Sequence, residues 1–330
     1  MELIKYSSIH SKEWDNFVND HPDGNIYHLS AWKSIVENTY GWTSYYYMLY
    51  DKDKIIGIVP FFEVRGINFN KSFLSLPYAS YAGILLSEKI HEDDIYDELG
   101  WNNELVSIRK VCNDNMTNDS AIVTMVLDLP EDSEELWGKF KAKVRNQVRK
   151  AEKSNIEFVT GKQYLDDCIG VYSKNMKRLG TPVHKNSFFR NILEEYKDNS
   201  DIWAVTKNGR VVGAMLVIYY KNVVFDYVAS TLPEYNRYNV NMMLYWGAIK
   251  KSIELGLGKF DFGRSTRDTG TYKFKKQWGT KEIQLDYYVL KNGNKTCIKV
   301  PQPGKLSKIW SKSPEFITNW LGPRIRRYIY

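Results

Sequence analysis

The sequence predicts a mixed α/β protein built from two similar domains. Its 330 residues exceed the usual size of one domain, and 43% of them are hydrophobic, which is enough for substantial cores. One order of elements, namely strand, two helices, three strands, helix and strand, occurs twice along the chain. The segment IIGI after DKDK in the first half has a counterpart, VVGA after KNGR, in the second. We therefore expect two tandem domains with a substrate cleft where they meet.

In the first half, alternating apolar residues between turn signals predict strands. These cover residues 3–6, 45–50, 55–64, 73–86 (one strand or a pair) and 121–127. Pro60 indicates an edge strand or a bulge, because proline cannot donate to a sheet ladder. Helices are expected from Ser11 and from Ser30 as N-cap, with Trp32 facing the core. A further helix leading to Asn113 carries its apolar residues at Ile95, Leu99, Leu105 and Ile108.

Residues 134–153 carry the clearest amphipathic pattern and predict one continuous helix. At about 100° per residue, its apolar side chains fall within one arc and its cations share the remaining surface. Ser133 is the expected N-cap, and Glu134 and Glu135 suit the positive end of the helix. A basic helix face is usually solvated, so this pattern alone does not establish function.

The second half repeats the plan. Residues 156–160 form an expected strand, and 163–179 and 187–197 are expected helices. The strands 202–206, 211–220 and 223–230 are predicted to form an antiparallel meander through turns at Asn208-Gly209 and Lys221-Asn222. Asn241 is the expected cap of a helix that ends at Gly256 or Gly258.

Residues 259–279 have the pattern of a site. Phe260 and Phe262 indicate a strand end, after which Gly263 is expected to open a loop that carries Arg264 and Ser265. Three aromatic residues (272, 274 and 278) then alternate with three lysines (273, 275 and 276). Cations on a segment that aromatic burial holds rigid suit an anionic ligand or a developing negative charge. The alternative is a strand and turn with a solvated charged face.

Three stretches resemble the FemAB-like acyltransferases. They are DFGRS (261–265) with GTYKFK (270–275) and WG (278–279), the basic stretch KVRNQVRKA (143–151), and LGTP (179–182). The family includes peptidoglycan interpeptide-bridge aminoacyltransferases and a branch associated with exopolysaccharide systems. The resemblance implies two tandem GNAT-like (acyl-CoA N-acyltransferase) domains. It also implies transfer of an acyl or aminoacyl group to an amine of a cell-envelope precursor.

The resemblance and the residue chemistry together nominate site residues. Acyl transfer needs donors for the oxyanion of the tetrahedral intermediate, and the family's functional lysine matches Lys275. Phe274 would position that segment, and Asp226 and Asp261 are weaker candidates for the amine proton. Arg145, Arg149 and Arg264 would bind phosphates or carboxylates. The remaining expected substrate-binding residues are Asn146, Lys150, Tyr227, Ser265, Tyr272, Lys273 and Trp278.

The acyl donor stays open, between aminoacyl-tRNA and acyl-CoA, and no tightly bound cofactor is expected. Residues 237–242 occupy the position of the GNAT pyrophosphate loop but contain no glycine, and Val240 is poorly suited to positive φ. This argues against conventional CoA binding. The helical hairpin that some Fem proteins insert is missing, which removes one feature that would support tRNA use without excluding it. The alternatives are a non-catalytic binding module for an anionic glycan precursor or RNA, and a CoA-dependent enzyme with a diverged loop.

The net charge and the cysteine content indicate the kind of partner and the cellular compartment to expect. The net charge of +7 and the pI near 8.9 favour an anionic partner such as a nucleotide-linked precursor or tRNA; DNA is not expected. Three scattered cysteines fit reduced thiols, without a zinc site or a disulfide. The absence of a signal-peptide pattern or an apolar span suggests a cytoplasmic protein. We expect domains at 1–132 and 155–298, a basic connecting helix at 133–154, and a tail at 299–330 that packs on the body or lies on an anionic membrane.

Overall fold

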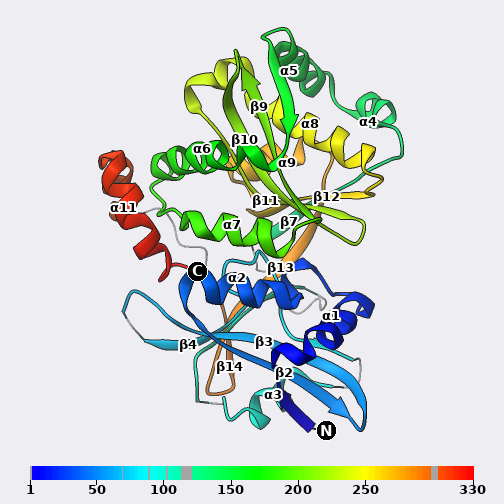
Figure 1. Cartoon of the computed structure of the whole chain (residues 1–330), viewed down its shortest axis with the longest axis vertical. Coiled ribbons are helices and arrows are strands. Elements are labelled where there is room, and N and C mark those ends of the chain that lie inside the picture. The colour runs from blue at the N-terminus through cyan, green and yellow to red at the C-terminus, as the bar shows by residue number, and fades with distance from the viewer. Residues whose placement is uncertain (1, 69, 88–89, 102, 113–120, 299–303) are drawn as a thin grey trace. The chain divides into compact units, whose positions relative to one another are not determined.

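The computed structural model describes residues 2–68, 70–87, 90–101, 103–112, 121–298 and 304–330 (Figure 1). The chain divides into two compact units. Unit 1 comprises Met1–Ile122, Gln284–Val300 and Arg327–Tyr330, and unit 2 comprises Val123–Ile283 and Pro301–Arg326. Within the described ranges, none of the helices combines the length and the apolar character that crossing a membrane requires.

Unit 1 is built on a sheet with the strand order β1-β2-β3-β4-β6-β13, in which only the β4–β6 pair is parallel. The strands are β1 (Glu2–Lys5), β2 (Thr43–Asp51), β3 (Lys54–Arg65), β4 (Lys71–Ser75), β6 (Val106–Val111) and β13 (Lys281–Lys291). The short strands β5 (Leu85–Leu86) and β14 (Asn294–Cys297) pair with β3 and β13. Its helices are α1 (Ser11–Asp20), α2 (Ser30–Tyr40) and α3 (Glu92–Glu98).

Aromatic side chains fill the core of unit 1. Trp101 stacks on Phe73 with ring centroids 4.2 Å apart, and Trp14 stacks on Tyr46 at 4.9 Å. Trp32 is fully buried, and its indole Nε1 donates to the Pro77 carbonyl at 3.1 Å. Its predicted place in the core is therefore confirmed, with the polar edge of the ring satisfied.

Three predictions for unit 1 were wrong. Helix α2 begins at Ser30 and has Leu29 as its N-cap, so Ser30 is not the cap. The helix expected to carry Ile95 to Ile108 ends with α3, because Gly100 takes a φ of +67° and Val106 begins β6 between two partner strands. Asn113, its expected end, lies outside the described residues. Pro60 marks neither an edge strand nor a bulge. It falls between the stretch of β3 that pairs with β5 and the stretch that pairs with β4, where a missing N–H costs the sheet little.

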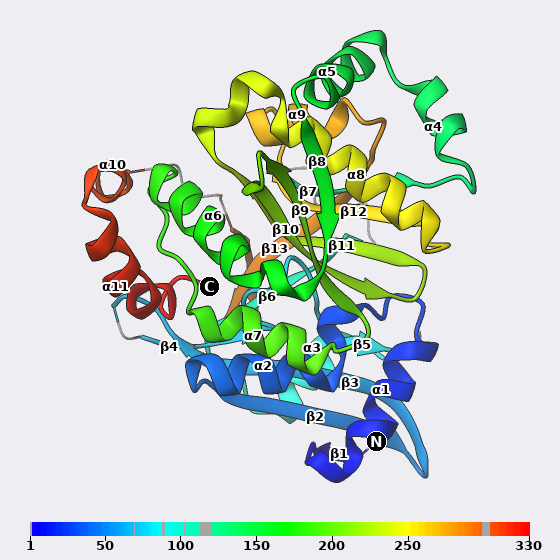
Figure 2. The same cartoon turned by 45° about the horizontal axis from the view of Figure 1, so that its top comes forward.

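In unit 2 the strands follow the order β7-β12-β11-β10-β9-β8 (Figure 2). Its strands are β7 (Ile122–Asp128), β8 (Ile156–Thr160), β9 (Ser200–Lys207), β10 (Arg210–Tyr220), β11 (Val223–Thr231) and β12 (Lys259–Thr266). The antiparallel meander β9-β10-β11 is confirmed, and Asn208 and Gly209 both take the positive φ that its first turn requires. Helices α6 and α8 both pack on β10, whose residues from Val211 to Ile218 are all buried.

The helices of unit 2 are α4 (Ser133–Lys139), α5 (Ala142–Glu152), α6 (Leu165–Arg178), α7 (Asn186–Glu195), α8 (Val240–Glu254), α9 (Gly270–Lys276), α10 (Lys305–Lys312) and α11 (Glu315–Arg326). Short 3-10 turns lie at Ser8–His10 and Ile26–His28 in unit 1, and at Lys162–Tyr164 and Pro233–Tyr238 in unit 2. The core of unit 2 lies where α5 and α8 meet the sheet, around the buried Trp203, Trp246 and Trp278.

Three further expectations for unit 2 are corrected. The helix predicted over 134–153 is two helices, because Phe140 and Lys141 take extended conformations, and the first begins with Asp132 rather than Ser133 as its N-cap. The cap of α8 is Asn239, not Asn241. Gly263 does not open a loop, since β12 continues to Thr266, and the lysine-rich segment after it is helix α9.

The compact units distribute the predicted domain segments differently from the sequence boundaries. The basic segment 133–154 lies in unit 2, together with most of 155–298. Residues 284–298, however, belong to unit 1, because β13 pairs with β6 over Leu285 to Leu290. The described part of the tail forms α10 and α11 in unit 2, followed by four residues in unit 1.

Candidate active site

The candidate site of unit 2 lies where the parallel strands β11 and β12 separate. They pair only at Val223–Lys259, Val224–Phe260 and Phe225–Asp261. On the other side of β11, the register against β10 skips Tyr227, which forms a β-bulge. Gly263 takes a φ of +71°, and a Cβ there would lie 3.2 Å from the Asp226 carbonyl oxygen. Glycine at this position therefore suits the positive φ and leaves room for the Asp226 carbonyl oxygen as the strands part.

A buried carboxylate stands beside the bulge. Asp226 accepts a 2.6 Å hydrogen bond at Oδ2 from the hydroxyl of Tyr245 on α8, while its Oδ1 is shielded from solvent and has no hydrogen-bond partner among the described residues. Burial raises the pKa of Asp226 to about 6, although the Lys275 charge and the Tyr245 hydrogen bond oppose this shift. This carboxylate can therefore gain and lose a proton near neutral pH.

Lys275 places an ammonium group in the same region. The residue is only 6% exposed, and its Nζ donates to the carbonyls of Gly263 and Arg264, both at 3.0 Å. Burial lowers the pKa of Lys275, while Asp226 and Asp261 act in the opposite direction. Two of the three ammonium donors thus hold the β12 backbone just beyond the point where β12 leaves β11.

Two other polar side chains of β12 are buried here. Asp261 Oδ1 accepts from Thr124 Oγ1 at 2.6 Å and from the backbone N–H of Gly263 at 2.8 Å. This arrangement fixes the strand more than it prepares Asp261 for proton transfer. Ser265 is 5% exposed, and its hydroxyl is buried without a hydrogen-bond partner among the described residues.

An aromatic wall surrounds the charged pair. The Tyr245 ring stacks on Phe262 with centroids 5.2 Å apart and meets Phe274 edge-on at 5.1 Å. Phe274 also packs against Trp278, which contacts Phe140 at the end of α4. Through these contacts Phe274 ties α9 to α8, and the wall lowers the local polarity around Asp226 and Lys275.

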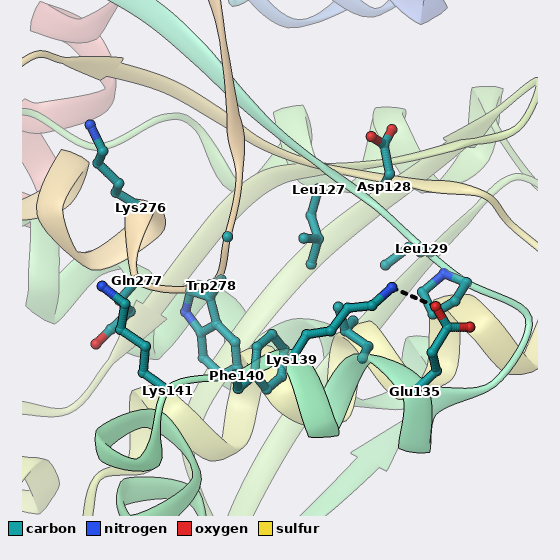
Figure 3. Close-up of a pocket in the computed structure, with 13 residues that line it drawn as sticks. Leu127, Asp128, Leu129, Glu135, Lys139, Phe140, Lys141, Lys276, Gln277 and Trp278 are labelled. Carbon is teal, nitrogen blue, oxygen red and sulfur yellow. Dashed lines mark hydrogen bonds and ion pairs between the residues drawn. The ribbon is translucent and has the colours of Figure 1, made fainter.

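A pocket of about 470 Å³ lies next to this wall (Figure 3). Its lining comes from the end of β7, from α4 with the junction to α5, and from the end of α9 with the turn after it. The cations in the lining are Lys139, Lys141 and Lys276, and Lys139 is paired with Glu135. Trp278 lies at its wall, fully buried, with an indole N–H that has no acceptor among the described residues. The pocket is not lined by Lys275 or Asp226.

The predicted residues of α5 do not join the Lys275 cluster in any contact of the described structure. Arg145 instead caps α4, donating from one guanidinium nitrogen to the carbonyls of Gly138 at 3.1 Å and Phe140 at 2.8 Å. The guanidinium of Arg149 lies 5.5 Å from the centre of the Trp137 ring. Asn146, Arg149 and Lys150 are exposed.

The other predicted binding residues differ in exposure. The Arg264 side chain and Lys273 are exposed, and Tyr227 is half-buried. Tyr272 is buried and donates its hydroxyl proton to Glu282, which also pairs with Arg267 at 3.1 Å. Tyr272 therefore has a place in a local hydrogen-bond network.

Tyr245 and Thr124 are the residues that sequence reasoning missed. Each orients a carboxylate of the site from a distant part of the chain, 19 and 137 residues away. The available signal for Tyr245 was its position on the apolar face of the predicted helix, three residues after Met242 and four before Ile249. No sequence pattern pairs Thr124 with Asp261.

The backbone conformation at the start of α8 differs from the expectation, and this difference bears on whether the acyl donor could be acyl-CoA. The positive φ falls on Asn239, at 56°, and not on Val240. Asparagine tolerates this conformation, so the backbone turns here without glycine. The sequence argument against a CoA-type pyrophosphate loop is correspondingly weaker.

Comparison with known proteins identifies the fold. Residues 138–276 match the acetyltransferase (GNAT) domain family. FemX superposes with a TM-score of 0.64 at 14% identity, over 86% of this chain and 95% of that one. A tandem GNAT protein from the clavulanic acid biosynthesis pathway gives 0.56 at 8% identity, over 87% and 97%.

The C-terminal domain of a putative lysylphosphatidylglycerol synthetase from Agrobacterium fabrum gives a TM-score of 0.55 at 11% identity, over 87% of this chain and 93% of that one. No curated protein matches the sequence. The predicted tandem GNAT fold is confirmed by these likenesses.

Proposed function

We propose that this FemAB-like tandem GNAT N-acyltransferase transfers an acyl or aminoacyl group to an amine of a cell-envelope precursor, of the peptidoglycan or exopolysaccharide type. The observation that supports the proposal most directly is a buried carboxylate, Asp226, beside a buried ammonium, Lys275, where the strands of the GNAT domain part. In a site with little water, the carboxylate of such a pair can accept the proton of the attacking amine, and the ammonium can stabilise the negative charge on the carbonyl oxygen.

In the proposed step, the acceptor amine attacks the carbonyl carbon of an ester or thioester donor. A C–N bond forms, and the carbonyl oxygen becomes an oxyanion. The amine nitrogen then loses a proton to Asp226, which is mostly ionised at pH 7 because its pKa is about 6. Collapse of the intermediate breaks the bond to the alcohol or thiol of the donor, and the proton held by Asp226 can pass to that leaving group.

Lys275 would contribute in two ways. Its bonds to the Gly263 and Arg264 carbonyls hold the β12 edge of the site, and its third N–H is available for the oxyanion or the leaving group. The aromatic contacts of Phe274 keep α9, and so the Lys275 stem, in place. Asp261, which Thr124 and Gly263 already engage, has a positioning role in this scheme.

The acceptor would carry phosphates or carboxylates. Exposed cations near the site, Arg264 and Lys273, can meet such groups, as can Arg149 and Lys150 on α5. Arg145 is less suited, since it already caps α4. The pocket beside α9 would accept an anionic portion of a substrate, with the Trp278 indole N–H as a donor at its wall.

We leave two donor classes as alternatives, aminoacyl-tRNA and acyl-CoA. The turn at Asn239 keeps the CoA option open, and the net positive charge suits either donor. Nucleotide-activated donors and precursors of this kind are cytoplasmic, so we place the reaction in the cytoplasm. A binding module without catalysis is the contrasting hypothesis.

The test is acyl transfer followed by intact-mass detection. Charged tRNAs and acyl-CoAs would be offered with amine-bearing UDP-sugar and muropeptide precursors to wild type, Lys275→Ala and the matched control Lys174→Ala. Lys174 lies on α6, is exposed and has no role in the proposed site, so its loss should leave the rate within about twofold. We expect Lys275→Ala to lower the rate by about 100-fold or more, with thermal unfolding reporting whether the variant is folded.

A wild-type rate in a folded Lys275→Ala variant would contradict the role given to this lysine. Tight binding of a precursor or RNA with no covalent product from any donor would favour the binding module. A steep decline of that affinity with salt would identify phosphate contacts as its source.

A further inference from the structure

The C-terminal helices of unit 2 present large apolar side chains to solvent. Of the ten large apolar side chains that are exposed in the described part of the chain, five lie on α10 and α11. Their exposed fractions are 80% for Leu306, 63% for Ile309, 74% for Phe316, 37% for Ile317 and 63% for Trp320. We call these five residues the C-terminal apolar face. Exposed apolar groups gathered in this way generally mark an interaction surface.

In helix α11 the buried side chains are small and the largest apolar side chains are exposed. The helix contacts α6 (Figure 2), and its buried positions are the small residues Thr318 and Gly322. A Cβ on Gly322 would lie 3.0 Å from the Val183 side chain, so the packing here is close. At 100° per residue, Phe316 and Trp320 point to the opposite side. The large residues therefore face away from the core.

Helix α10 continues this surface. Its first turn packs closely on the chain just after α6, because a Cβ on Gly180 would lie 2.3 Å from the Ser307 carbonyl oxygen. Leu306 and Ile309 remain outside, one turn apart. Only Ser313 and Pro314 separate the two helices, and both helices contact α6. The exposed apolar residues therefore come from two adjacent helices that share α6 as a neighbour.

Cations border the apolar face. Lys305, Lys308 and Lys312 form a stripe along α10 next to Ile309, and the Arg324 guanidinium lies 4.4 Å from the centre of the Trp320 ring. Glu315 is the only acidic residue between 304 and 326. Lysines are depleted in protein–protein interfaces, whereas aromatic and aliphatic residues rimmed by lysine and arginine are typical of helices that lie in a bilayer interface.

We propose that the C-terminal apolar face binds the surface of an anionic lipid bilayer. The five apolar side chains would enter the headgroup region, Trp320 would sit at the interface, and the lysines of α10 with Arg324 would contact lipid phosphates. The helices would lie on the membrane and not cross it. Arg326 would keep α11 on the body, since its Nε donates to the buried His184 Nε2 at 3.2 Å. This inference does not depend on the acyl transfer proposed above.

The test is cosedimentation of the full chain with vesicles. We expect binding to vesicles of equal parts phosphatidylcholine and phosphatidylglycerol, and little binding to phosphatidylcholine alone. The double substitution Phe316→Ser with Trp320→Ser should weaken binding by about tenfold or more. Replacing Lys305, Lys308 and Lys312 with glutamine should weaken it by about 100-fold, at about fivefold per charge. These positions are exposed, so thermal unfolding should hardly change.

The matched control is Ile9→Ser with Ile67→Ser, which removes two exposed apolar side chains of unit 1, 84% and 68% exposed, that lie outside the apolar face. It should bind as wild type does. Three results would overturn the proposal. They are absence of wild-type binding to anionic vesicles at low salt, unchanged binding of the Phe316/Trp320 variant, and concentration-dependent dimerisation that the same variant abolishes while vesicle binding is absent. The last result would assign the face to a second copy of the chain.

Discussion

Burial determines the protonation of the central residue pair. Asp226 and Lys275 are removed from water, which raises the pKa of the carboxyl and lowers that of the ammonium, and their mutual attraction opposes both shifts. The Tyr245 hydroxyl tunes Asp226 further by donating to its Oδ2. A carboxylate with a pKa of about 6 is mostly ionised at neutral pH and is still basic enough to accept a proton.

A pH profile tests this at the residue scale. In wild type, kcat/KM should rise with pH through a midpoint near 6, because Asp226 must be ionised to accept the amine proton. Asp226→Asn should lose this limb and about 100-fold in rate. Tyr245→Phe should move the limb to higher pH, because the phenol hydrogen bond lowers the pKa of Asp226.

The acceptor amine also titrates, and its ionisation gives a second pH-dependent region of the kcat/KM profile. This region should be the same in wild type, Asp226→Asn and Tyr245→Phe, so it serves as the internal control. A limb near pH 6 that persists in Asp226→Asn would assign the base to another group. A limb that does not move in Tyr245→Phe would show that the phenol merely fills space.

At the scale of elements, the close packing of helix α8 on the sheet determines where Tyr245 lies in the site. Gly247 faces β8, and a Cβ there would lie 2.2 Å from the Cδ2 atom of Phe158. Tyr245 stands two residues earlier on the same helix. A small residue at this contact therefore fixes the distance of α8 from the sheet, and with it the reach of the Tyr245 hydroxyl to Asp226.

Gly247→Ala should lower the free energy of unfolding by about 1–3 kcal/mol, since the added methyl group displaces the Phe158 ring or the helix. Acyl transfer should fall with it. Gly170→Ala in α6 is the control, because nothing lies within 4 Å of its Cβ position; that change should stabilise by up to about 1 kcal/mol. Urea unfolding measures both. Equal stabilities for the two variants would refute the close contact.

The break between α4 and α5 could not be predicted from the sequence, because the helical spacing of apolar residues continues across it. Trp137, Val144 and Val148 keep helical spacing across the break, so the periodicity runs on. Phe140 and Lys141 are nevertheless extended, and Arg145 supplies the donors that the carbonyls at the end of α4 need. The side chain that resembled a phosphate ligand is thus also a helix cap.

At the scale of the whole molecule, unit 1 is discontinuous in sequence. Its strand β6 has β13 as a neighbour, from Val111 opposite Leu285 to Val106 opposite Leu290. The Tyr288 hydroxyl donates to Glu92 at 2.9 Å, and the Arg109 guanidinium donates to the Tyr330 carbonyl at 2.7 Å. Segments from the far end of the chain therefore complete this unit.

A fragment of residues 1–122 should accordingly fail to fold cooperatively, because β6 would become an unprotected edge and the core would lose Tyr288. A fragment of residues 123–326, which contains all of unit 2, should retain a cooperative transition. Chemical denaturation followed by circular dichroism compares the two with the full chain. A cooperative transition in the 1–122 fragment would contradict the expectation.

Much of the fold was predictable because its signals are local. The antiparallel meander of unit 2 follows from alternating apolar residues and an Asn208-Gly209 turn. Short-range patterns also predicted a helix near Ser30, although its N-cap is Leu29 and not Ser30. The segment 105–111 was assigned to the wrong element, because a short apolar run suits a helix or a strand equally until its partners are known.

By itself, the sequence determined the order of most elements, the tandem GNAT plan and the motif that contains Lys275. These depend on residue types at short spacing, which each segment carries wherever it lies. Only the tertiary structure decided that β11 and β12 part beside Asp226, that Tyr245 donates to that carboxylate, and that Lys275 is buried against the Gly263 carbonyl. The reason is physical: burial and hydrogen bonding arise between groups that the chain brings together from distant positions, and they set the pKa values on which the proposed chemistry depends.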